Sequence, residues 1–106
     1  MNERKLKAVK AAGFKVTTPA DWLGLTKEEA TIVEMRVALS RELERQRKAN
    51  GITQAQLAAV LGTRQSGIAR LERRPETASI ETLIKGLVAI GVPLTKIAAC
   101  LVLGVN

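Results

Sequence analysis

Histidine and tyrosine do not occur in this 106-residue chain, and cysteine, phenylalanine and tryptophan occur once each. Without histidine, the Ser-His and Cys-His catalytic pairs and most zinc sites are excluded. The scarcity of aromatic rings removes the stacking platform on which the usual single-stranded RNA modules depend. The lone Cys100 cannot form a disulfide within the chain and fits a reducing compartment. A Gly-rich phosphate loop and a cysteine cluster are also lacking, so we expect a protein that is not an enzyme and that has no cofactor and no metal.

Long apolar runs are missing as well. No window of about 18 apolar residues exists and the N-terminus has no apolar signal core, so we expect a cytoplasmic protein that does not enter a membrane. Positive charge is in excess, with 17 Lys and Arg against 10 Asp and Glu and a formal net charge of +7. This balance favours a polyanionic partner, although charge alone does not separate DNA from RNA or an acidic membrane. The length and the 46% apolar content suit one compact domain.

The first 26 residues predict a basic N-terminal extension. Residues 2–12 alternate basic and apolar residues like an amphipathic helix, which either packs on the domain or contacts DNA or a partner. Residues 14–17 alternate like a short strand, and Thr18-Pro19-Ala20-Asp21 predicts a one-turn helix that ends near Leu23. We place the boundary after this extension, so that residues 1–26 form the extension and residues 27–106 form the main domain.

A long helix is predicted over residues 27–49. Thr26 and Glu29 form a capping box at its start, and no Gly or Pro interrupts it. Apolar residues recur along it at helical spacing, at Ile32, Met35, Leu39 and Leu43. At its end cluster Arg45, Arg47 and Lys48. These cations either compensate the negative end of the helix or contact a phosphate.

The stretch 53–73 predicts two short helices that meet at a tight turn. Thr53 and Gln56 form a second capping box, which starts a helix near Gln54, and Gly62 can take the positive φ that ends it. A second helix begins near Gln65 with Ile68 and Leu71 on its apolar side. Its other side then carries an amide, a hydroxyl and guanidinium groups, which suit base edges and phosphates.

The pattern Thr53-Gln54-x-x-Leu57-Ala58-x-x-x-Gly62-x-x-Gln65-Ser66-x-Ile68-x-Arg70-Leu71-Glu72 resembles the helix-turn-helix of the lambdoid phage repressors and the wider Xre group. The resemblance implies an all-α, five-helix, lambda-repressor-like DNA-binding domain over roughly residues 28–101, with its third helix in the major groove. It implies base contacts from Gln65, Ser66 and Arg70 and a phosphate contact from Gln54.

Further phosphate contacts are expected from Arg64, Arg73 and Arg74. The alternative for Arg70 and Arg73 is an ion pair with Glu72, Glu76 or the long helix. Two positions depart from the family pattern. Arg64 stands where a Ser or Thr cap is usual, which moves the cap to Thr63 or leaves it weak. Gly67 removes a possible base contact and costs about 1 kcal/mol of helix propensity.

Two more helices complete the predicted domain. Ser79 caps a fourth helix that ends at Gly91, with inward residues Ile80, Leu83, Ile84, Leu87 and Val88. A fifth helix begins near Pro93. Its apolar end should pack against the core or a second subunit. The resemblance places the dimer contact around this last helix, so the predicted interface residues are Ile97, Leu101, Val102 and Leu103.

These patterns predict a sequence-specific transcription regulator that binds a double-stranded DNA operator as a homodimer, reads two half-sites about 34 Å apart and acts as a repressor. The segment of residues 20–29 before the long helix is similar to HigA-type antitoxins, which repress their own operon and bind a RelE-like ribonuclease toxin. That similarity implies a RelE-like toxin as a second partner. The alternative is a non-catalytic protein-interaction adaptor that uses the same fold, with the apolar tail and the long helix as docking faces.

Overall fold

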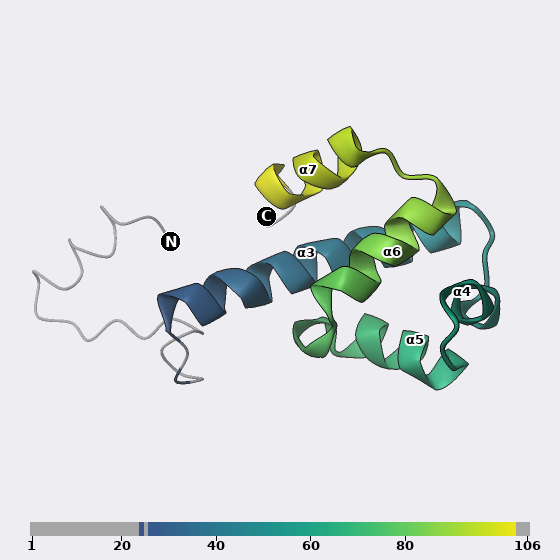
Figure 1. Cartoon of the computed structure of the whole chain (residues 1–106), viewed down its shortest axis with the longest axis horizontal. Coiled ribbons are helices and arrows are strands. Elements are labelled where there is room, and N and C mark those ends of the chain that lie inside the picture. The colour runs from purple at the N-terminus through teal and green to yellow at the C-terminus, as the bar shows by residue number, and fades with distance from the viewer. Residues whose placement is uncertain (1–23, 25, 104–106) are drawn as a thin grey trace, which may run out of the picture. The chain divides into compact units, whose positions relative to one another are not determined.

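A computed structural model describes Gly24 and residues 26–103 of the chain (Figure 1). Five α-helices and one short 3-10 helix form this described part, in which no strand occurs. The domain is therefore all-α, as predicted. The predicted helix at residues 2–12, the strand at 14–17 and the one-turn helix ending near Leu23 lie outside the described residues. Contacts divide the chain into two units, residues 1–30 and 31–106; the boundary expected after residue 26 stays a prediction.

The helices begin at or next to the predicted residues. They are α3 (Lys27–Ala49), α4 (Gln54–Leu61), α5 (Gln65–Arg73), α6 (Ile80–Ile90) and α7 (Leu94–Leu103). The connection between α5 and α6 contains the 3-10 helix η1 (Pro75–Thr77). Pro75 suits the first position of such a turn because a proline there gives up no helical hydrogen bond.

The core lies between α3 and the four shorter helices. Figure 1 shows α4 and α5 on one side of α3 and α6, and α7 on the other. Gly86 of α6 allows α6 to lie close to α3, since a Cβ at this position would come within 3.0 Å of two carbon atoms of the Leu43 side chain. The buried residues of the main apolar cluster are Leu39, Leu43, Leu57, Ala58, Ile68, Leu71, Ala78, Leu83, Leu87, Val92 and Ile97.

The prediction for the inward side of α6 is partly wrong. Leu83 and Leu87 are fully buried, but Ile84 and Val88 are exposed. Each of the two exposed residues follows a buried one and is rotated from it by about 100° around the helix axis. Because α6 has two adjacent apolar stripes, the spacing of its apolar residues does not tell which stripe faces the core.

Candidate nucleic-acid interface

The turn between α4 and α5 has the predicted caps. Thr53 Oγ1 accepts from the backbone N–H of Gln56 at 3.0 Å, and Gln56 Oε1 accepts from the backbone N–H of Thr53 at 2.9 Å. At the other end of α4, Gly62 has φ 68°, which an L side chain would strain. The backbone N–H of Thr63 donates to Ala58 O at 2.9 Å. Both ends of α4 are thus fixed by local hydrogen bonds.

Helix α5 has two chemically different sides. Ile68 and Leu71 are buried in the core, whereas Gln65, Ser66 and Arg70 are exposed. The structure therefore places the three predicted base-contacting residues together on the solvent side of one helix. That they contact bases stays a prediction.

The start of α5 has no side-chain cap within the described part of the chain. Arg64 is the N-cap residue and its side chain makes no capping hydrogen bond. Of the two expected outcomes, a cap shifted to Thr63 or a weak cap, the structure has the weak one. Thr63 lies beside the helix instead, since a Cβ at Gly67 would come within 3.0 Å of Thr63 Oγ1. The glycine leaves room for this threonine.

The side-chain amide of Gln54 makes a hydrogen bond within the domain. Its Nε2 donates to Glu72 Oε1 at 2.9 Å. An amide nitrogen carries two protons, so this bond uses one and leaves the other for an acceptor outside the domain. A phosphate contact from Gln54 is therefore compatible with its place in the structure.

The arginines predicted to contact bases or phosphates are exposed. Arg64, Arg70 and Arg73 form no ion pair with any residue that the structure describes, and Arg74 Nε lies 3.9 Å from Glu76 Oε1. The alternative in which Arg70 or Arg73 forms an ion pair with Glu72 or Glu76 is thus not observed. Their charges remain available to a polyanion.

A buried ion pair joins α3 to the end of α5. Arg47 Nε and Nη2 donate to the two carboxylate oxygens of Glu72 at 2.7 and 3.0 Å, and Arg47 Nη1 donates to Ile52 O at 2.9 Å. The hydrogen bond that Arg47 donates to Glu72 raises the pKa of Arg47 above its ordinary value. Arg47, which the sequence groups with Arg45 and Lys48 as a possible phosphate contact, is instead used inside the domain.

Two further side chains of α3 contact the end of α5 and the η1 turn that follows it. The buried hydroxyl of Ser40 donates to Leu71 O at 2.7 Å. Arg36 Nη1 donates to Glu76 O at 3.3 Å. Sequence reasoning missed Ser40, Arg36 and the Arg47–Glu72 pair, because no local pattern links residues that are 25 to 40 positions apart.

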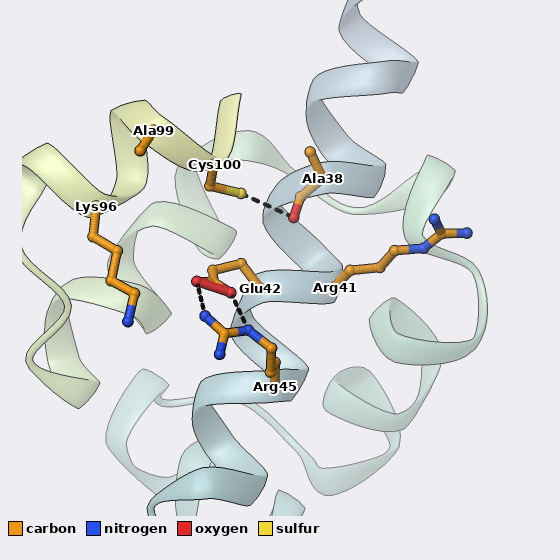
Figure 2. Close-up of a pocket in the computed structure, with 7 residues that line it drawn as sticks. All are labelled: Ala38, Arg41, Glu42, Arg45, Lys96, Ala99 and Cys100. Atoms are coloured by element: carbon orange, nitrogen blue, oxygen red, sulfur yellow. Dashed lines mark hydrogen bonds and ion pairs between the residues drawn. The ribbon is translucent and has the colours of Figure 1, made fainter. Parts of the chain in front are cut away.

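A hollow of about 380 Å³ lies between α3 and α7 (Figure 2). In it Arg45 makes two hydrogen bonds to the carboxylate of Glu42, and the Cys100 thiol donates to Ala38 O at 3.3 Å. The bond from Arg45 lowers the pKa of Glu42, whereas burial raises the pKa of the Cys100 thiol. A thiol that stays protonated is a poor nucleophile, so this hollow offers no activated cysteine.

The described residues hold no group of three or more His, Cys, Asp or Glu side chains that could bind a metal ion, and no helix among them is long and apolar enough to cross a bilayer.

The predicted interface residues of α7 differ in their surroundings. Ile97 is buried in the core of its own domain and Leu101 packs against that core. Val102 is 77% exposed. The side chain of Leu103 lies outside what the structure describes. Among the three whose side chains the structure describes, Val102 is the most exposed, and the dimer contact stays a prediction.

Comparisons with known proteins place this geometry in a family. The profile of the helix-turn-helix family matches residues 43–97. A Haemophilus influenzae protein described as an uncharacterized HTH-type transcriptional regulator is 39% identical over 69 residues, which cover 65% of this chain and 70% of that protein. No solved structure matches the chain. With a matching profile, a matching relative and the observed α4–turn–α5 geometry, the chain belongs to the Xre-like helix-turn-helix family of DNA-binding transcription regulators.

Proposed function

We propose that this chain is a sequence-specific binder of double-stranded DNA that regulates transcription by placing α5 in the major groove. The observation that carries the proposal is the two-sided α5, with Ile68 and Leu71 in the core and the base-reading groups in solvent. Arg70 can donate to O6 and N7 of guanine, Gln65 can pair with N6 and N7 of adenine, and Ser66 can serve either base. A good bidentate pair of this kind is worth about 1–3 kcal/mol of discrimination.

Affinity comes mainly from the phosphate contacts. Arg64, Arg73 and Arg74 are exposed around α5, and Gln54 keeps one amide proton free. The backbone N–H groups at the uncapped start of α5 add donors for a phosphate.

The test uses a single arginine variant and a neighbouring double arginine variant as each other's controls. A preferred site is first selected by the full chain from randomised double-stranded DNA. Arg70→Ala should then lose preference at one base pair, whereas Arg73→Ala with Arg74→Ala should weaken all DNA about equally and flatten the salt slope by about two. Equal weakening of every site by Arg70→Ala would make Arg70 a phosphate or structural residue, and an unchanged salt slope in the double variant would remove both arginines from the footprint.

The same salt titration tests the adaptor alternative. Counterion release gives a slope of about 0.9 per phosphate contacted. A slope of less than about two would imply fewer than about three phosphate contacts and would favour the adaptor. A steep slope together with a selected site would favour the DNA-binding regulator.

We further propose that the protein acts as a homodimeric repressor with half-sites about 34 Å apart. Exposed Leu94 and Val102 lie on one side of α7, eight residues apart with Ala98 between them, and so form an apolar stripe that a second subunit can cover. Val102→Asp should shift sedimentation toward the monomer. The control is Val60→Asp on α4, which charges a side chain that is 66% exposed outside the stripe. Equal behaviour of the two variants would place the interface elsewhere.

The similarity to HigA-type antitoxins suggests a RelE-like toxin as a second protein partner. A tagged copy of the chain, coexpressed with the product of the adjacent reading frame, should retain that product on purification and repress a reporter driven by their shared promoter. If the chain represses the reporter but retains no partner, it is a repressor and the antitoxin proposal is wrong.

A further inference from the structure

We propose that Ser40, which lies inside the domain, is a positioning residue that sets the orientation of α5 and thereby the sequence discrimination of the protein. This inference rests on the proposed function, because it concerns how α5 is held while it reads DNA.

The two ends of α5 are held differently. At its start, Arg64 supplies no side-chain cap in the part of the chain that the structure describes. At its end, Leu71 O is one of the last four carbonyls, which have no partner within a helix. Ser40 Oγ donates to this carbonyl at 2.7 Å, and Ser40 is 1% exposed. The C-terminal half of α5 is therefore the half that α3 anchors.

Three contacts leave α3 from one side of the helix. Arg36, Ser40 and Arg47 are spaced by four and seven residues, so they lie on one helical face. Arg36 reaches Glu76 O at 3.3 Å and Arg47 reaches the Glu72 carboxylate at 2.7 Å. Both of these contacts run through long side chains with several rotatable bonds. Ser40 has a single side-chain torsion and binds the backbone of α5, so it fixes the position of α5 with the least freedom.

The consequence falls on Arg70 more than on Gln65. Arg70 precedes Leu71, so the carbonyl that Ser40 holds lies in the same turn as the Arg70 backbone. Bidentate pairing with a base edge tolerates displacements of only about 0.5 Å. Long, exposed arginines can follow a phosphate after such a displacement. Loss of the Ser40 bond therefore lowers discrimination and leaves non-specific affinity in place.

The experiment measures a ratio of affinities in the full chain. The two DNAs are the site selected by the unaltered protein and a scrambled duplex of equal length, at a temperature where circular dichroism shows every variant folded. Ser40→Ala should lower the selected-to-scrambled ratio about tenfold, comparable to losing one bidentate base contact. Its affinity for the scrambled duplex should stay unchanged.

The matched control separates positioning from stability. Val92→Ala shortens a buried side chain in the connection between α6 and α7 and so lowers stability away from α5. It should leave the ratio unchanged. A double-mutant cycle adds the direct test. If Ser40 acts through Arg70, Ser40→Ala in an Arg70→Ala background should cost no further discrimination.

The outcomes decide between the two roles. Ser40→Ala could lower the melting temperature yet show the same selected-to-scrambled ratio as Val92→Ala, or its effect could simply add to that of Arg70→Ala. In either case Ser40 only stabilises the fold and the inference is wrong. Should Ser40→Ala fail to fold, Ser40→Cys retains the size with a weaker donor, and an unchanged ratio in that variant overturns the inference equally. The unaltered chain is measured first: if it shows no preference for any DNA, the proposed function itself fails and the inference falls with it.

Discussion

Replacing Glu72 by alanine should destabilise the domain strongly, because this carboxylate is the buried acceptor for side chains from two other helices. Its side chain is 6% exposed and accepts from Arg47 Nε and Nη2 and from Gln54 Nε2. The substitution would leave the Arg47 guanidinium, which is 10% exposed, without its counter-ion. Breaking a buried pair from one side costs about 3–5 kcal/mol. The whole unfolding free energy of such a domain is about 5–15 kcal/mol, so the variant should lose a large part of it.

The assay is urea unfolding followed by the helical circular dichroism signal. Glu81→Ala is the matched control, since Glu81 pairs with Lys85 at 3.1 Å but its side chain is 77% exposed. This exposed pair should be worth less than about 1 kcal/mol and should weaken further in high salt. A second arm replaces both buried partners, with Arg47→Met and Glu72→Leu together. That variant should recover much of the lost stability, because no charge is left buried alone.

Two results would refute this reasoning. One is an equal cost for Glu72→Ala and Glu81→Ala, which would mean that burial adds nothing to the Arg47–Glu72 pair. The other is a double variant no more stable than Glu72→Ala, which would mean that the cost does not come from an unpaired guanidinium.

Two further predictions concern pH and the helical glycines. The hydrogen bond from Arg45 lowers the pKa of Glu42, so the Glu42 carboxylate stabilises the fold fully above its ordinary pKa of 4.5 and loses that contribution as the pH falls through the lowered pKa. The urea midpoints of the unaltered protein and Glu42→Gln should therefore differ at neutral pH and converge in acid. A difference between the midpoints that stays constant with pH would contradict this role of Glu42. Gly86→Ala should lower the melting temperature by an amount that reflects about 1–3 kcal/mol of overpacking, since the new Cβ meets a buried leucine at 3.0 Å. Gly67→Ala meets only the exposed Thr63 hydroxyl at the same distance, so it should be near neutral; equal losses would show that the neighbouring atoms do not decide the outcome.

Local signals explain why the helix-turn-helix part of the fold could be predicted. The Thr53–Gln56 capping box spans three residues, and Gly62 ends α4 through its own φ of 68°. The spacing of Ile68 and Leu71 then fixes which side of α5 is buried. Each of these features acts within one or two turns of helix, so the sequence alone contains the information.

Patterns that depend on distant packing were less predictable. Ile84 and Val88 have the same spacing as the buried Leu83 and Leu87, and only the position of α3 decides which stripe is covered. Arg47 has the composition of a surface cation at a helix end, yet it binds Glu72, 25 positions further along the chain. Nothing local distinguishes a cation that faces solvent from one that has a buried partner elsewhere.

The contrast between local signals and contacts of distant residues also applies to DNA recognition by this domain. Which side chains of α5 face solvent follows from local periodicity, so Gln65, Ser66 and Arg70 could be named from the sequence. How firmly α5 is held follows from Ser40 and Arg47, whose contacts cross 31 and 25 positions. A relative that kept the exposed side of α5 but lost these buried polar contacts would keep the same set of exposed polar groups. It would nevertheless present them less rigidly, and we expect its discrimination between DNA sequences to be weaker at similar non-specific affinity.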